Sequence, residues 1–562
     1  MFKLIKNLDY KIEKNYIKIK LVEIKQGVNC LKDFIIVKKD KKYSVYDRIC
    51  DHNNGRIISK DNQHVCPIHN WKFDPISGTY INGFKKKERK FKLNKKFLEV
   101  ENLKEVPKIS KIEGKEKTKI RFFNHAFLKV EGKNFSFATD PWAFGPAFNT
   151  GWWLKHKTKI DWADELNSCS FIYISHNHPD HLHPLTLSKL KKNIDIIVPK
   201  FTTDSTGLYL EELGFKNIHR LEFATEYRFR NTKLMLSILK SGDFREDSGI
   251  YFSNGDFDCL FSVDTSSINF DRLPNVDLFA SSFAGGASGF PLMFETIKKE
   301  EKRKILIKNK NFIKTNNYRR LKKTKASYYL PYAGFFEEKL SRDKIIATLQ
   351  KKNKIDDYDS YCKKNSIKLL NVEKNDEYYF DGKKLEIENK KNIKLYRDIS
   401  PAKYLKAYKE NYRKIDLNYI KTYFEKSKFK DNLILTISLV DDNFKNSKLN
   451  FKVDFTGIKP KFSKLDKPKS ILNNLKNIKQ LFLKCRKESF LNTIYNKSPW
   501  EDLSIGFQCM VDRIPNEYNY KFWYHFTNKY ITSKNVRSST ECNSCEKLMQ
   551  YFHTQTTQQN SL

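Results

Sequence analysis

Residues 171–181 read Phe-Ile-Tyr-Ile-Ser-His-Asn-His-Pro-Asp-His and carry the strongest fold signal in the chain. The first four of these residues are aromatic or β-branched, which is typical of a buried strand. The loop that follows is rich in ligand-type side chains. Because a strand end brings such side chains together, the loop is predicted to bind one or two metal ions. The predicted ligands are His176, His178, Asp180 and His181.

Strand-like runs alternate with helix-like runs on both sides of this loop, from residue 115 to residue 340. Such alternation is typical of layered domains that combine helices and strands. A strand that ends in His-x-His-x-Asp-His resembles the metallo-β-lactamase signature. We therefore predict a metallo-β-lactamase-like αββα sandwich over residues 115–340, within an α+β multidomain protein.

The other metal ligands expected from that signature are altered. The fold normally brings a further His from a later strand end, where this chain has none and Asp243 is the best substitute. Asp264 matches the Asp that bridges two metals. No His lies between His219 and His525, so the last His ligand of the fold is absent. Asp180 and Asp243 are also the predicted catalytic residues.

Replacing imidazoles by carboxylates gives this predicted site a larger share of hard oxygen ligands than the site of a dizinc hydrolase has. Two His with one or two carboxylates resemble the ligand set of non-haem iron oxygenases, which keep positions open for dioxygen. We therefore predict iron at this second site, with zinc as the alternative. Zinc has no redox chemistry, so it would leave an electron-carrying centre elsewhere in the chain without a purpose.

Such an electron-carrying centre is predicted near the N-terminus. The chain has Cys50-x-His52 followed by Cys66-x-x-His69. One Cys and one His on each of two loops is the Rieske arrangement, in which two thiolates hold one iron of a [2Fe–2S] cluster and two imidazoles hold the other. Structural zinc is the alternative. Short β-rich segments surround these ligands, so an all-β Rieske domain is predicted over residues 1–105.

Composition limits the remaining possibilities. Residues 341–425 are predicted to form a mainly helical extension, and residues 426–550 a C-terminal mixed α/β region. The 106 Lys and Arg against 66 Asp and Glu give a charge of +40. The positive residues are distributed along most of the chain, which a general bias toward Lys, Ile and Asn explains. Nucleic acid is therefore not the expected partner. Without an apolar leader, a membrane span or a disulfide framework of cysteines, a cytoplasmic protein is expected.

The order of the two predicted domains resembles one family, the CMP-N-acetylneuraminate hydroxylases. Residues 66–74, Cys-Pro-Ile-His-Asn-Trp-Lys-Phe-Asp, are similar to the Rieske loop of that family. Residues 283–291, 332–336 and 500–508 look like its later segments. The resemblance extends from about residue 43 to about residue 530.

This resemblance implies a monooxygenase that uses O2 to convert the N-acetyl methyl group of a CMP-activated sialic acid into a glycolyl group. It implies electrons from a ferredoxin-like or cytochrome-like donor and its reductase, delivered through the Rieske cluster. The family carries a His where this chain has Asp243, so a related anionic sugar nucleotide or acidic sugar stays open as the substrate.

Two other functions fit the same motifs. One is a metal-dependent hydrolase in which the Rieske domain senses redox state. The other is an electron-transfer or regulatory protein whose second site has decayed. The missing imidazoles argue against the hydrolase.

Overall fold

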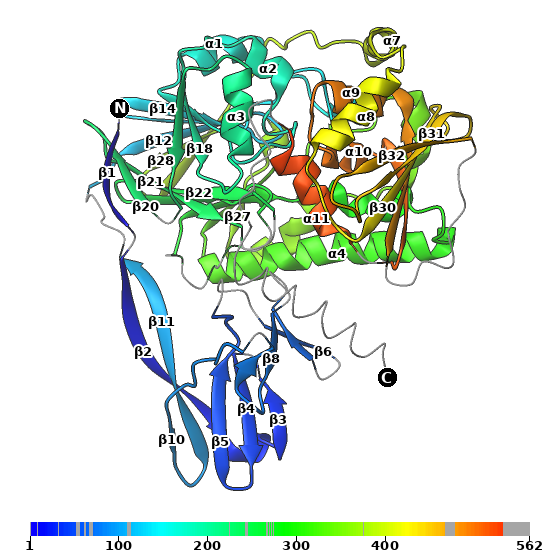
Figure 1. Ribbon diagram of the computed structural model, residues 1–562. Helices are drawn as coiled ribbons and strands as arrows, with labels where there is room; N and C mark the ends of the chain where they lie inside the picture. Colours follow the sequence, from blue (N-terminus) through cyan, green and yellow to red (C-terminus); the bar gives the residue numbers. More distant parts are fainter. Residues whose placement is uncertain are drawn as a thin grey trace, which may run out of the picture.

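The computed structural model describes residues 2–7, 9–31, 33–51, 57–60, 63–66, 71–81, 83–108, 114–223, 225–241, 245–265, 268, 270, 273, 275–374, 376–466, 478–516 and 518–531. Figure 1 shows a small N-terminal domain of strands that stands apart from a larger body. Within that body, a sandwich of two sheets lies beside a third sheet, which belongs to the C-terminal region.

The first sheet of the sandwich carries the predicted metal-binding loop. Among the described residues it has eight strands, in the order β19-β18-β17-β14-β13-β12-β28-β29. Because β14, β17, β18 and β19 run parallel, their carboxyl ends lie along one edge, and the loop leaves β17 there. The bounds are β12 (Lys117–Asn124), β13 (Phe127–Gly132), β14 (Phe135–Thr139), β17 (Phe171–Tyr173), β18 (Asp195–Pro199), β19 (Asn217–Leu221), β28 (Asp376–Asp381) and β29 (Lys384–Asn389).

The second sheet packs against the first. Its described strands number eight, in the order β1-β20-β21-β22-β23-β24-β25-β27. The strands from β1 to β23 pair antiparallel, and those from β23 to β27 pair parallel. The bounds are β1 (Phe2–Asn7), β20 (Thr225–Phe229), β21 (Leu234–Lys240), β22 (Ser248–Asn254), β23 (Phe257–Phe261), β24 (Leu278–Ser282), β25 (Tyr328–Tyr332) and β27 (Lys368–Leu369).

Both faces of β17 are buried, which explains its uninterrupted apolar sequence. Phe171 and Tyr173 join the core between the two sheets, whereas Ile172 and Ile174 pack into the core beneath the helices on the outer face. Other helices cover the second sheet, where Leu321 of α4 joins the inner core. This arrangement confirms the predicted αββα sandwich. The outer helices are α1 (Trp162–Asn167), α2 (Pro184–Ser188) and α3 (Ser205–Glu212), and α4 (Lys299–Thr324), α5 (Lys344–Leu349) and α6 (Asp359–Lys364) follow.

The N-terminal domain is built from strands, as predicted. Its described part holds three small sheets, ordered β10-β11-β2, β3-β4-β5 and β6-β7-β8-β9. A long ribbon of β2 and β11 connects it to the larger body (Figure 1). The bounds are β2 (Asp9–Lys20), β3 (Gly27–Cys30), β4 (Phe34–Lys39), β5 (Lys42–Asp47), β6 (Ile58–Lys60), β7 (Gln63–Val65), β8 (Lys72–Asp74), β9 (Thr79–Tyr80), β10 (Phe91–Leu93) and β11 (Phe97–Lys108).

The C-terminal region forms a sheet whose five described strands run in the order β32-β31-β30-β33-β34. Its core includes Leu292 and Leu306, so it is shared with the segment that precedes it. None of the helices in the described ranges has the length and apolar character needed to cross a membrane. The bounds are β30 (Leu433–Val440), β31 (Ser447–Asp454), β32 (Lys461–Leu465), β33 (Lys479–Arg486), β34 (Cys509–Ile514), α7 (Pro401–Asn411), α8 (Leu417–Lys426), α9 (Lys487–Tyr495), α10 (Glu501–Ile505) and α11 (Tyr520–Tyr524).

The sandwich draws on more of the chain than residues 115–340. β1 pairs with β20, and the segment 341–425, predicted as mainly helical, supplies β27, β28 and β29 beside its helices. β28 forms a strand of the sandwich because apolar residues alternate along it. Tyr378 and Phe380 both point into the core, and β28 pairs with β12.

Helix α1 is fixed to the first sheet by a group of charges. The two terminal guanidinium nitrogens of Arg121 each lie 2.6 Å from the carboxylate of Glu165, and the Lys129 ammonium lies 2.5 Å from the same carboxylate. Burial alone would raise the pKa of Glu165, but these cations lower it to about 2. The ion pairs therefore stabilise the fold wherever Glu165 is ionised.

We expect Glu165→Gln to lower the free energy of unfolding by about 1–2 kcal/mol at neutral pH, because partial exposure screens the pairs. Since folding lowers the pKa, this contribution is complete above the usual value of 4.5 and disappears as the pH falls toward 2. Chemical denaturation of both proteins across this pH range measures the difference. Glu386→Gln, at a side chain that is 69% exposed, is the control and should change stability little. A constant difference between wild type and Glu165→Gln at all pH values would contradict the assignment.

Candidate metal centre

Asp140, which directly follows β14, holds the loop after β17 in place. Its carboxylate accepts hydrogen bonds from the backbone N–H and the hydroxyl of Ser175, at 2.7 and 2.8 Å. The same carboxylate lies 3.0 Å from Nδ1 of His181. Asp140 therefore fixes the start of the loop and orients one of its imidazoles.

One group of potential ligands surrounds His176 and His178. Nε2 of His176 and Nδ1 of His178 face each other at 3.0 Å. Asp247 brings a carboxylate oxygen within 4.8 Å of both rings, and all three side chains are buried. Asp247 is placed there because β22 begins at the next residue, Ser248, whose hydroxyl donates to the backbone oxygen of Ser175 at 2.7 Å.

A second group lies beside the first. His125, in the turn between β12 and β13, places Nε2 3.1 Å from Oδ2 of Asp180. Nε2 of His181 lies 3.4 Å from the carboxylates of both Asp180 and Asp264. Asp264 also groups with His176, so it joins the two sets of ligands. Each of the two sets offers at least three nitrogen and oxygen ligands.

Two buried atoms in the second group indicate that a cation belongs there. Oδ1 of Asp180 and Nε2 of His181 are buried without a hydrogen-bond partner in the part of the chain that the structure describes. Although burial alone lowers the pKa of His181, the surrounding carboxylates of Asp180, Asp264 and Asp140 raise it well above its usual value. A metal ion would supply the positive charge that these carboxylates otherwise draw from a proton.

The two imidazoles of the first group differ in protonation: His176 is ready to bind metal, whereas His178 must first give up a proton. Burial lowers the pKa of His176 well below its usual value, so the ring is neutral and able to bind metal. Burial also disfavours a charged His178, but the hydrogen bond and the charge of Glu501 raise its pKa to about 9. Nitrogen and carboxylate oxygen in this proportion suit iron as well as zinc.

The structure brings together five of the six predicted metal ligands: His176, His178, Asp180, His181 and Asp264. The sixth, Asp243, lies outside the described residues. Sequence reasoning missed His125 and Asp247. His125 directly follows a strand-like run, which is a weak signal, and Asp247 lies in the same short segment as Asp243.

Aromatic side chains cover one side of the first group. The Phe148 ring lies 5.9 Å from the ring of His178 and 4.5 Å from that of Trp152, which stacks on Phe336 at 3.6 Å. Trp152 and Phe336 belong to a small sheet formed, in the described chain, by β15 (Pro146–Ala147), β16 (Trp152–Leu154) and β26 (Phe336–Glu337). These aromatic side chains therefore pack against one another and also cover one side of the site.

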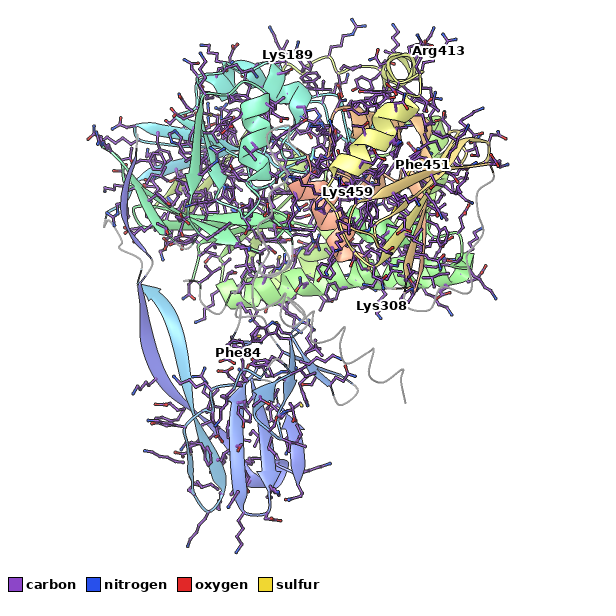
Figure 2. All side chains as sticks on the ribbon, in the orientation of Figure 1. Phe84, Lys189, Lys308, Arg413, Phe451 and Lys459 are labelled. Carbon is purple, nitrogen blue, oxygen red and sulfur yellow. The ribbon has the colours of Figure 1, made fainter. Side chains whose placement is uncertain are left out.

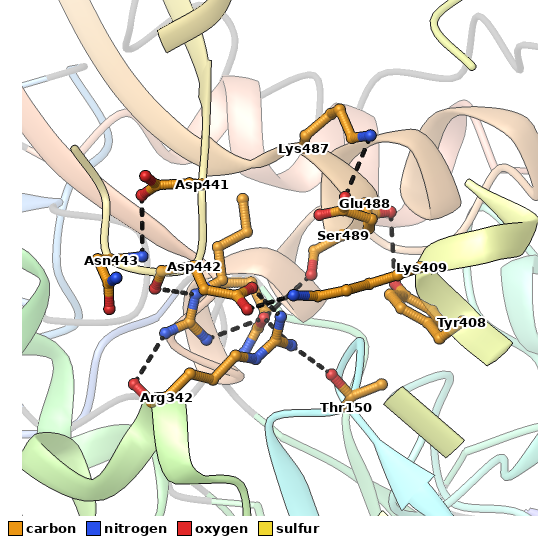
Figure 3. Close-up of polar contacts among 12 residues, drawn as sticks. Thr150, Arg342, Tyr408, Lys409, Asp441, Asp442, Asn443, Lys487, Glu488 and Ser489 are labelled. Atoms are coloured by element: carbon orange, nitrogen blue, oxygen red, sulfur yellow. Dashed lines mark hydrogen bonds and ion pairs between the residues drawn. The ribbon is translucent and has the colours of Figure 1, made fainter. Parts of the chain in front are cut away.

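The turn that carries Phe148 has an unusual backbone. Phe148, Asn149 and Thr150 have φ angles of 50°, 52° and 73°. Left-handed conformations cost roughly 1–2 kcal/mol for each residue that is not glycine. Side chains hold the turn, because Asn149 donates to Thr493 at 3.0 Å and Thr150 accepts from Arg342 at 2.6 Å. Figure 3 shows the hydrogen bond between Thr150 and Arg342 beside several other charged side chains.

The predicted Rieske site is partly described. Cys50 and Cys66 are both 1% exposed, as thiolates that hold a cluster should be, whereas His52 and His69 lie outside the described residues. Buried Lys86 supports the first loop by donating to the backbone oxygen of Ile49 at 2.5 Å. The pair of buried cysteines fits the thiolate half of a Rieske centre.

Comparison with known proteins places the chain in a family. A family model for the Rieske [2Fe–2S] domain matches residues 5–100. Cytidine monophosphate-N-acetylneuraminic acid hydroxylase of Macaca mulatta is 30% identical over 94% of this chain and 95% of its own length. The chain belongs to the cytidine monophosphate-N-acetylneuraminic acid hydroxylase family. The Xenopus laevis member is 30% identical over 90% of this chain and 91% of its own.

Solved structures resemble a part of this hydroxylase-family chain. A putative metal-dependent hydrolase from Parabacteroides distasonis covers 46% of this chain and 96% of its own, with 14% identity and a TM-score of 0.29. CmlA, a diiron β-hydroxylase from Streptomyces venezuelae, covers 49% of this chain and 55% of its own, with 15% identity and a TM-score of 0.31.

Membership of the hydroxylase family confirms the predicted family resemblance and the prediction of an oxidoreductase. The matched family model confirms the predicted Rieske domain with its [2Fe–2S] cofactor. Iron at the second site agrees with both findings and with the His and Asp groups described above. A Rieske hydroxylase receives its electrons from another protein, so an electron-transfer partner is part of the system.

We expect His125→Ala and Asp247→Ala each to weaken iron binding at the second site by at least roughly tenfold, because each removes a ligand-type side chain. The measurement is total iron minus the iron that EPR assigns to the Rieske cluster. His219→Ala is the control, since His219 lies on β19 and bonds Asp195 at 2.6 Å, outside the described metal groups. Wild-type iron content in both variants would remove His125 and Asp247 from the site.

Proposed function

We propose that this chain is a Rieske, iron-dependent monooxygenase that hydroxylates the N-acetyl group of a CMP-sialic acid or of a closely related anionic sugar nucleotide. The observation that carries the proposal is the 30% identity to the Macaca mulatta hydroxylase over 94% of the chain, which includes both metal-binding regions. In this reaction one oxygen atom of O2 enters a C–H bond. The other leaves as water, with two electrons and two protons taken up.

The proposed ligands divide into two sets. His176, His178 and Asp247 hold one ion, His125, Asp180 and His181 hold the other, and Asp264 lies between the two. Iron bound there supplies the chemistry that activates dioxygen. Asp243 stays a proposed ligand and catalytic residue, beside Asp180.

The protein itself prepares the site for this reaction. Asp140 holds the His181 ring from behind, so the ring keeps its orientation when the ligands bind metal. The rings of Phe148 and Trp152 keep one side of the pocket apolar, which excludes water from the reacting groups. Asp264, with a side chain that is 34% exposed, is the part of the site that is open to solvent.

The Rieske ligands are proposed to be Cys50, His52, Cys66 and His69. The cluster takes one electron at a time, so the donor is a one-electron carrier, either ferredoxin-like or cytochrome-like, served by a reductase. A chain with a net charge of +40 favours an acidic carrier, since opposite charges steer the two proteins together. Six described cysteines outside the Rieske loops are thiols, which supports a reducing, cytoplasmic location.

The test is turnover of CMP-N-acetylneuraminate by the reconstituted protein with a chemical or enzymatic reductant under ¹⁸O2. We expect a product with a hydroxylated N-acetyl group that carries one ¹⁸O atom, and no product without oxygen or with Cys66→Ala. Mass spectrometry detects the hydroxylated product and the ¹⁸O atom that it carries. Zinc-dependent hydrolysis of a phosphoester or lactone, with no oxygen incorporation, would instead establish the hydrolase.

A further inference from the structure

A carboxylate from the C-terminal region reaches the metal centre. Glu501, the first residue of α10, places Oε2 3.0 Å from Nε2 of His178, although the two residues are 323 positions apart. The Glu501 side chain is only 12% exposed and that of His178 only 8%. Burying a charged group this deeply costs free energy unless the group has a partner, and the partner here is a proposed metal ligand.

The two nitrogens of His178 have different neighbours. Nδ1 faces Nε2 of His176, the other imidazole of the first group, at 3.0 Å, whereas Nε2 faces Glu501. An imidazole that binds metal through one nitrogen carries its proton on the other. A carboxylate that accepts this proton fixes the tautomer, holds the ring plane and strengthens the nitrogen as a ligand.

Glu501 is itself held firmly at both ends. Its backbone N–H donates to the hydroxyl of Thr527 at 3.1 Å, and its Oε1 accepts from the hydroxyl of Tyr518 at 3.2 Å. The preceding residue, Trp500, is fully buried and donates from its indole to Tyr423 at 2.8 Å. Each of these contacts lies within the C-terminal region, so the carboxylate cannot follow His178 if the ring turns.

The segment after Glu501 is fitted tightly against the sandwich. At Gly151, a Cβ would come within 2.2 Å of the backbone oxygen of Gly506, which ends α10. Two residues on, the Gln508 amide accepts from Arg342 at 3.1 Å and from Ser489 at 3.0 Å.

We propose that Glu501 is a positioning residue that holds His178 with Nδ1 toward the metal, so that the C-terminal region completes the metal centre of the sandwich. This inference rests on the proposed function, because it takes His178 as a metal ligand. It assigns a role to the part of the chain for which the sequence offered none.

The experiment uses the full-length protein with its Rieske cluster intact. The second site is emptied by dialysis against a chelator and titrated with Co²⁺, whose visible absorption reports the number and kind of its ligands. Glu501→Ala should weaken Co²⁺ binding about 10–100-fold and change the visible spectrum. Glu501→Gln, whose amide oxygen still accepts the proton of Nε2, should lose clearly less affinity than Glu501→Ala.

The controls separate positioning from folding. Glu488→Gln, in α9, changes a carboxylate of similar burial that pairs with Lys487 and should leave Co²⁺ binding unchanged. The Rieske EPR signal and the Tm of every variant are measured on the same samples. A merely structural Glu501 would lower the Tm of Glu501→Ala and Glu501→Gln without changing the affinity or the spectrum of bound Co²⁺.

The outcomes also distinguish this inference from the function on which it rests. If wild type incorporates ¹⁸O into product but Glu501→Ala binds Co²⁺ with wild-type affinity and spectrum, the role of Glu501 is wrong and the proposed function stands. If wild type binds no metal at its second site, or binds it and catalyses only hydrolysis, the proposed function itself is overturned.

Discussion

Carboxylates and imidazoles are packed into one buried volume at the edge of the sandwich, and their charges must balance there. Asp140, Asp180 and Asp247 are each 4% exposed or less, and removing ionised carboxylates from water is expensive unless positive charge accompanies them. The backbone around this volume follows from that constraint. β14, β17 and β22 all end or begin at it, so each brings at least one carboxylate or imidazole to a shared point.

The C-terminal region is a structural part of this centre. Besides Glu501, its chain contacts the ligand loop through Thr527, whose backbone oxygen accepts from the Asn177 amide at 2.9 Å. Tyr524 donates to the buried carboxylate of Glu246, next to Asp247, at 3.1 Å. The sheet of this region also shares its hydrophobic core with Leu292 and Leu306. The sandwich and the helical segments of the C-terminal region thus meet at the site.

The sequence predicted what depends on local pattern. The apolar run before His176 identified a strand, and its His-rich loop identified the fold and most of the proposed ligands. Ligands that depend on tertiary contact were less accessible: Asp247 is chosen over its neighbours because Ser248 bonds the ligand loop, and Glu501 reaches His178 only through packing of α10. Strand β28 was missed because its charged residues mask the alternation of Tyr378 and Phe380, and strand β29 was missed because none of its residues is buried.

The left-handed turn at 148–150 links the shape of the pocket to the order in which the chain is made. Its anchors, Arg342 and Thr493, are synthesised long after the turn itself, and domains generally fold as they leave the ribosome. Until those anchors arrive, the turn has no reason to keep its strained backbone, and Phe148 has no fixed place beside His178. The side of the metal centre that Phe148 covers is therefore completed late in synthesis, after residue 493 has been made.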